Sequence, residues 1–120
     1  MTATAQELTP DVATRIRDAV TDLRPAWTGF LQALVRTPSQ TGDEAAVQAV
    51  VAAKMRDLGL ATDVWEPSMS ELAPHAESFT AVESFAGRPN VVGVAQGRGG
   101  RSLILNGHID TVEVGEPSQW

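Results

Sequence analysis

The sequence predicts an α/β protein whose mixed sheet contains an antiparallel hairpin and is covered by helices on both faces. Two long segments repeat apolar residues at spacings of three and four, which is typical of amphipathic helices. Three short apolar runs follow them and are typical of strands. The last two runs are continuous in apolar character, which favours a sheet buried on both sides.

The first helix is predicted between Thr9 and Arg36. Thr9 is a suitable N-cap, and Pro10 suits the first helical position because its missing N–H group is not needed there. Pro25 removes one hydrogen bond inside the segment, but the apolar stripe continues beyond it. We therefore expect one helix with a kink near Leu23–Pro25. The stripe consists of Val12, Ile16, Val20, Leu23, Trp27, Leu31 and Leu34.

The second helix is predicted to begin after "TGDE". Thr41 and Glu44 have the spacing of a capping box, and Gly59 is suited to end the helix in the left-handed conformation. A short strand is expected within Leu60–Pro67. The stretch Pro67–Arg88 is rich in polar residues and predicts a long surface excursion with one short helical turn. The inward face of the helix is expected to carry Val47, Val51, Met55 and Leu58.

The last two strands are predicted at Asn90–Ala95 and Ser102–Gly107. They are joined by the glycine-rich sequence "QGRGGR". This link is far too short for a parallel crossover, which needs a dozen or more residues. The two strands are therefore expected to pair as an antiparallel hairpin.

Composition narrows the class of protein. The 120 residues are 42% hydrophobic and 20% charged, as in an ordinary globular protein, and are enough for one domain. A net charge of −6 gives no electrostatic basis for binding nucleic acid or an anionic membrane. Without cysteines, a metal could be held only by His, Asp or Glu side chains. No signal peptide or membrane-spanning run is present, so we expect a soluble cytoplasmic protein.

His108 and Asp110 are the main candidates for chemistry. They directly follow the predicted strand Ser102–Gly107, and α/β folds bind ligands at the carboxyl ends of strands. An imidazole is a good zinc ligand when its second nitrogen is held by an acceptor, and an aspartate two residues later can provide that acceptor. Taken alone, the pair is a weak motif, and a His and an Asp in an ordinary turn are the favoured interpretation.

The segment "LILNGHIDTVEVGEPSQW" closely resembles the signature of a zinc metallopeptidase family. That family is typified by acetylornithine deacetylase and includes succinyl-diaminopimelate desuccinylase, aminoacylase and glutamate carboxypeptidase. Two positions depart from the signature, since Glu113 stands where Pro is commoner and Glu116 where Asp is commoner. Upstream, "LVRTPSQTGDE" and "GRPNVVG" are similar to the family more loosely. The matching residues are Gly107, His108, Asp110, Thr111, Val112, Gly115 and Trp120.

The resemblance implies a three-layer α/β/α domain with two zinc ions per site, cobalt or manganese being alternatives. It implies that His108 is a metal ligand and that Asp110 is the catalytic-site carboxylate that orients it. The implied reaction is hydrolysis of an amide bond in an N-acyl amino acid or small peptide, and the full-length enzyme could be a homodimer. The family's other ligands and general base follow this motif, so residues 1–120 are expected to be the N-terminal portion of one catalytic domain and inactive alone.

The sequence leaves alternatives open for the function and for several candidate site residues. The protein could be a non-catalytic interaction module that keeps the fold without a working metal site. His75 could be a second ligand, although a solvated loop histidine is the favoured interpretation. Glu113 and Glu116 are interpreted as a solvated acidic loop, and Gln96–Ser102 as a hairpin turn instead of a phosphate-binding loop.

Overall fold

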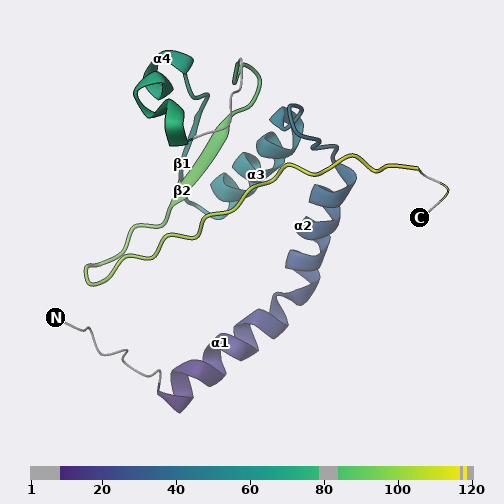
Figure 1. The fold of residues 1–120 in the computed structure, drawn as a ribbon. Coiled ribbons are helices and arrows are strands. Elements are labelled where there is room, and N and C mark those ends of the chain that lie inside the picture. The colour runs from purple at the N-terminus through teal and green to yellow at the C-terminus, as the bar shows by residue number, and fades with distance from the viewer. Residues whose placement is uncertain (1–8, 79–83, 117, 119–120) are drawn as a thin grey trace. The chain divides into compact units, whose positions relative to one another are not determined.

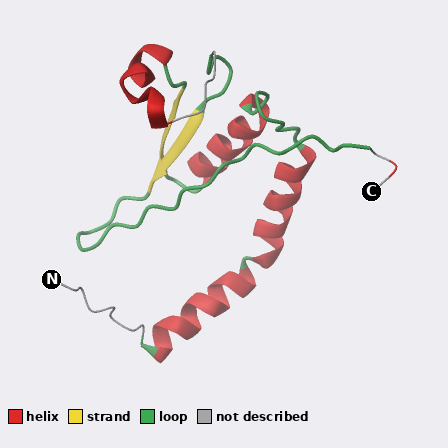
Figure 2. Ribbon diagram, in the orientation of Figure 1, coloured by secondary structure: helices red, strands yellow, loops and turns green. Residues whose placement is uncertain are grey.

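A computed structural model describes residues 9–78, 84–116 and 118. The chain divides into two compact units, residues 1–36 and residues 37–120, and each is described by itself. Among the described residues, the first unit contains two helices, and the second combines helices with a two-stranded antiparallel sheet (Figures 1 and 2). The predicted mixture of helices and strands is therefore confirmed.

The first unit consists of α1 (Pro10–Asp22) and α2 (Arg24–Arg36). Thr9 is the N-cap and Pro10 the first helical residue, as predicted. The expected single kinked helix is instead two helices separated by Leu23. The Leu23 N–H donates to Ala19 O and the Trp27 N–H donates to Leu23 O, both at 3.0 Å, so the hydrogen bonding continues on each side of the break. Pro25 has no amide hydrogen and cannot donate a helical hydrogen bond to the preceding turn, which explains why the break lies here.

The second unit begins with Thr37, and its helix α3 (Ala45–Asp57) ends as the sequence predicts. Gly59 has φ = 74°, which only glycine adopts readily. The Gly59 N–H donates to Arg56 O at 2.8 Å and the Leu60 N–H donates to Met55 O at 3.0 Å. This pair of bonds is the Schellman motif, which satisfies the last carbonyl groups of the helix.

The sheet pairs β1 (Ala61–Trp65) with β2 (Asn90–Val94), so both strands lie where the sequence predicts them. They are antiparallel, with Ala61 opposite Val94 and Trp65 opposite Asn90. The predicted pairing of Asn90–Ala95 with Ser102–Gly107 is wrong, because β2 pairs with β1 and residues 102–107 form no strand. The apolar character of a strand does not by itself determine which strand it pairs with. The β1–β2 pair is the one that α3 packs against and covers.

Helix α3 covers one face of this sheet, and Gly93 makes the close approach possible. A Cβ atom at Gly93 would lie 2.7 Å from Met55 Sδ and 2.9 Å from Leu60 Cδ1. On the opposite face, Val92 and Val94 are exposed. Within the described part of the chain, the covering of both faces that the sequence predicts is therefore present on one face only.

The core of the second unit is small. Val47 and Ala52 of α3 are the buried hydrophobic residues among those described, and Val51 and Met55 are partly buried. Leu58, expected on the same inward face, is exposed. It lies at the C-cap, after the last full turn that packs on the sheet.

The excursion between the strands contains α4 (Met69–Leu72) and the 3-10 helix η1 (Ala73–Ser78). Ser68 caps α4 by accepting a hydrogen bond from the Glu71 N–H at 3.1 Å. The predicted short helical turn is thus present, and residues 79–83 of the predicted excursion lie outside the described residues. Within the described ranges, no helix has both the length and the apolar character required to cross a membrane.

Candidate functional site

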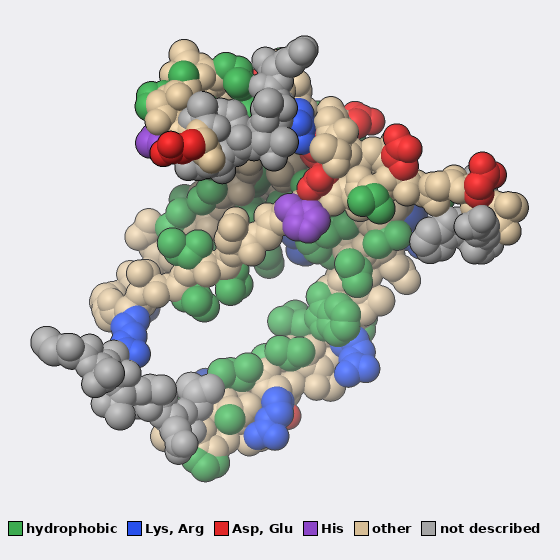
Figure 3. Space-filling view, viewed as in Figure 1, with side chains coloured by type: hydrophobic (Ala, Val, Ile, Leu, Met, Phe, Trp, Pro, Cys, Tyr) green, Lys and Arg blue, Asp and Glu red, His purple; other side chains and the backbone are tan. Residues whose placement is uncertain are grey.

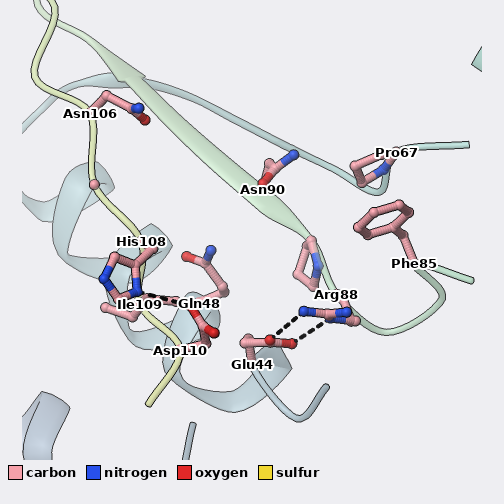
Figure 4. Close-up of a pocket in the computed structure, with 12 residues that line it drawn as sticks. Glu44, Gln48, Pro67, Phe85, Arg88, Asn90, Asn106, His108, Ile109 and Asp110 are labelled. Carbon is pink, nitrogen blue, oxygen red and sulfur yellow. Dashed lines mark hydrogen bonds and ion pairs between the residues drawn. The ribbon is translucent and has the colours of Figure 1, made fainter. Parts of the chain in front are cut away.

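Four segments of the second unit surround an open pocket of about 350 Å³. The start of α3, Pro67 after β1, the turn that leads into β2 and residues 106–110 all contribute to it. Figure 4 shows His108 and Asp110 on one side of this pocket and Arg88, Glu44 and Phe85 on the other. The pocket therefore gathers the residues that the sequence singled out with several that it did not.

A short parallel bridge brings the His108 segment to the loop before α3. The Thr111 N–H donates to Ser39 O at 2.8 Å, and the Thr41 N–H donates to Thr111 O at 3.3 Å. Ser39 is buried. These bonds place Asp110, the neighbour of Thr111, within reach of the Thr41 side chain.

The His108 and Asp110 side chains contact each other as the spacing predicts. His108 Nδ1 lies 2.9 Å from Asp110 Oδ1, and the other carboxylate oxygen accepts a hydrogen bond from Thr41 Oγ1 at 2.7 Å. The Thr41 hydroxyl, and then His108, hold the pKa of Asp110 below its ordinary value. Asp110 is therefore an ionised acceptor at neutral pH. The His108 side chain is 85% exposed, and no described residue bonds to its Nε2 atom.

Glu44 and Arg88 also line the pocket and form an ion pair. Arg88 Nε donates to Glu44 Oε2 at 2.9 Å, and Arg88 Nη2 donates to Glu44 Oε1 at 2.7 Å. The Gly42 N–H adds a bond of 2.8 Å to the same carboxylate, whose side chain is only 7% exposed. Hydrogen bonding to Arg88 holds the pKa of Glu44 below its ordinary value and raises that of Arg88. The guanidinium also lies 5.7 Å from the centroid of the Phe85 ring, within cation–π range.

This geometry overturns the predicted capping box. Glu44 is itself the N-cap residue of α3, and its side chain makes no cap hydrogen bond. Arg88 competes for that carboxylate and binds it with two charge-assisted bonds, which are stronger than a bond to a neutral amide. Thr41 likewise directs its hydroxyl to Asp110. The sequence pattern singled out Thr41 and Glu44, but the prediction that their side chains cap α3 is wrong. They bind Asp110 and Arg88 instead.

The other candidate residues do not join the site. His75 lies in η1 and is exposed, and Glu113 and Glu116 are exposed in a segment without regular structure. The turn "QGRGGR" contains Gly99 and Gly100 with positive φ and precedes no helix, so it does not have the form of a phosphate-binding loop. Across residues 9–78, 84–116 and 118, no group of three or more His, Asp or Glu side chains could hold a metal ion.

The arrangement fits one ligand position of a metal site. With Nδ1–H donated to the Asp110 carboxylate, the neutral imidazole of His108 presents its Nε2 lone pair to solvent. This is the form in which histidine ligates zinc, with an orienting carboxylate behind it. A catalytic zinc ion needs about three protein ligands, and the described residues contain no group of three that could supply them.

Comparisons with protein-family models, with curated proteins and with solved structures found no match to this chain. Family membership therefore stays a prediction that depends on the motif around His108. The hydrogen-bonded geometry of His108, Asp110 and Thr41 is the structural basis for proposing what the site does.

Proposed function

We propose that this chain supplies a metal-ligating histidine, His108, to the site of a zinc-dependent hydrolase that cleaves an amide bond of an N-acyl amino acid or small peptide. The observation that carries the proposal is the bond of 2.9 Å between His108 Nδ1 and Asp110 Oδ1. When the ring is neutral and Nδ1 is the donor, this bond leaves Nε2 as the exposed lone pair, as a metal-ligating histidine requires. The resemblance of "NGHIDTV" to the metallopeptidase signature gives the reaction class.

Each side chain has a proposed role. His108 binds the metal through Nε2, and Asp110 holds the ring in the required orientation. A bound zinc ion supplies Lewis-acid polarisation of the scissile carbonyl and activation of water. Gln48, Asn90 and Asn106 line the same pocket, and their amide groups complement the donors and acceptors of a peptide-like substrate.

The proposal extends to the architecture. The helix-covered pair β1–β2 belongs, in this interpretation, to a three-layer α/β/α domain that is completed by protein outside the described residues. The exposed second face of the sheet, with Val92 and Val94, supports this, because a parallel or mixed sheet of such a domain is covered on both sides. In this proposal, the remaining metal ligands and the general base also come from protein outside the described residues.

A second candidate function is an interaction module without a working metal site. The observation that favours it is that the described residues contain no group of three or more side chains that could hold a metal ion. Under this alternative, the pocket would bind a partner and His108 would have no special role.

Metal content and activity of the full-length protein separate the two candidates. We expect His108→Ala to abolish hydrolysis of N-acetyl amino acids and to lower bound zinc, because it removes a metal ligand. His75→Ala is the matched control, since it removes the other histidine of the chain from an exposed position in η1. It should retain wild-type zinc content and turnover. Equal zinc content and activity in the two variants would favour the interaction module.

A further inference from the structure

We propose that Thr41 is a positioning residue of this site, whose hydroxyl fixes the Asp110 carboxylate and thereby selects the His108 tautomer that exposes Nε2. This inference rests on the proposed function for its purpose, but the contacts that support it do not depend on a metal. Thr41 lies 69 positions away from Asp110 in the sequence, and no motif pairs them.

Both oxygens of the Asp110 carboxylate are engaged. Oδ2 accepts the Thr41 hydroxyl at 2.7 Å, and Oδ1 faces His108 Nδ1 at 2.9 Å. A carboxylate bonded through one oxygen can still rotate about its terminal torsion, which has a broad energy profile. The bond from Thr41 to the other oxygen restrains that rotation and keeps Oδ1 directed at the imidazole.

The backbone holds donor and acceptor in register. The Thr41 N–H donates to Thr111 O, and the Thr111 N–H donates to Ser39 O, on either side of the side-chain bond. Thr41 and Asp110 are thus placed by two adjacent backbone bonds instead of by a chance approach of two loops. The backbone pairing of these two segments therefore fixes the Thr41–Asp110 contact.

Chemistry fixes the direction of each proton. An ionised carboxylate can only accept, so the Thr41 hydroxyl donates and Asp110 stays free to accept from His108 Nδ1–H. No described residue bonds to the far side of the His108 ring, which is 85% exposed. The tautomer of this ring therefore depends on Asp110, and the orientation of Asp110 depends on Thr41.

The test compares variants of the full-length protein. Thr41→Val and Thr41→Ala remove the hydroxyl, the first with a similar shape and the second with no added atoms. Thr41→Ser keeps the donor. Thr62→Val is the matched control, because it makes the same chemical change at a hydroxyl in β1 that donates to the backbone oxygen of Leu60.

Two readouts are taken from each variant. Nitrogen-15 NMR of histidine-labelled, metal-free protein, under alkaline conditions in which imidazole is neutral, reports the fraction of His108 protonated on Nδ1. Titration with zinc alone reports affinity. We expect Thr41→Val and Thr41→Ala to shift His108 towards a mixture of tautomers and to weaken zinc binding about tenfold, at the low end of the effect of losing such orienting partners. Thr41→Ser and Thr62→Val should match the wild type.

The outcomes separate this inference from the proposed function. If Thr41→Val and Thr41→Ala both retain the wild-type tautomer, the inference is overturned whatever the zinc result. If the tautomer changes but the wild type binds no zinc, Thr41 keeps its positioning role and the proposed hydrolase function fails. If Thr41→Ser behaves like Thr41→Val, the hydroxyl is not the active group and the inference is again overturned.

Discussion

Asp110 links two other side chains, Thr41 and His108, at the centre of the candidate site. It accepts from Thr41 and from His108, so a turn residue in the loop before α3 and an imidazole beyond Gly107 are joined through one carboxylate. The sequence predicted the His108–Asp110 contact because the two residues are close in the chain. It could not predict the contribution of Thr41, since hydrogen bonds between distant segments leave no local periodicity.

The ion pair between Glu44 and Arg88 gives a prediction about pH. Arg88 lowers the pKa of Glu44 in the folded protein, so the pair stabilises the fold above the unfolded pKa of about 4.3. That stability is lost as pH falls through the folded pKa. We expect Glu44→Gln to lower the urea unfolding free energy by about 1–3 kcal/mol at pH 7, because Arg88 then loses its charged partner. Its disadvantage relative to the wild type should shrink between about pH 5 and pH 3.

The control for this prediction is Arg88→Gln, alone and combined with Glu44→Gln. The double variant should show an unfolding free energy close to that of either single variant, because one interaction is removed in all three. Additive losses in the double variant, or a constant difference between wild type and Glu44→Gln across this pH range, would contradict the account.

For helices and strands, the sequence predicts where each element begins and ends better than it predicts which other segment the element contacts. The start of α1, the end of α2, the Gly59 stop and both strands β1 and β2 lie where local patterns place them. The strand at Ser102–Gly107 and its pairing do not form. Instead β2 pairs with β1, which lies far away in the sequence, and α3 packs on that pair, so local patterns did not reveal the pairing. The capping box fails for a similar reason, since Arg88 binds Glu44 from 44 positions away.

The contact between α3 and β2 provides a prediction at this scale. Gly93→Ala introduces a methyl group 2.7 Å from Met55 Sδ and 2.9 Å from Leu60 Cδ1, so both side chains must move. We expect a loss of about 1 kcal/mol in unfolding free energy, the low end for overpacking because both neighbours are flexible. Gly29→Ala, in helix α2 with nothing within 4 Å of the new Cβ, should instead gain up to about 1 kcal/mol.

Replacing Met55 by Ala should remove most of the added cost of Gly93→Ala, which a double-mutant cycle measures. Equal effects of Gly93→Ala and Gly29→Ala on urea unfolding would mean that α3 does not pack closely on β2.

At the scale of the whole molecule, many large apolar side chains of the described residues are exposed. The consecutive residues Leu103, Ile104 and Leu105 are 81–87% exposed, and Val47 and Ala52 are the buried hydrophobic side chains within the described residues. In the lower part of Figure 3, apolar side chains also gather on the visible surface of α1 and α2. Exposed apolar surface of this extent is typical of sites that contact a further protein, a membrane or a ligand. It agrees with the proposal that the sheet and the metal site are completed outside the described residues.

The central claim is that Asp110 orients a metal-ligating His108, and Asp110→Asn in the full-length protein tests it most directly. An asparagine can still accept through its oxygen, but it lacks the charge that strengthens the imidazole as a ligand. After zinc is stripped and reloaded, we expect zinc affinity to fall about 10–100-fold in Asp110→Asn and further in His108→Ala, with hydrolysis of N-acetyl amino acids in the same order. The thermal stability of the metal-free forms should not change. If Asp110→Asn binds zinc and turns over substrate like the wild type, Asp110 is only a turn residue and the account is wrong.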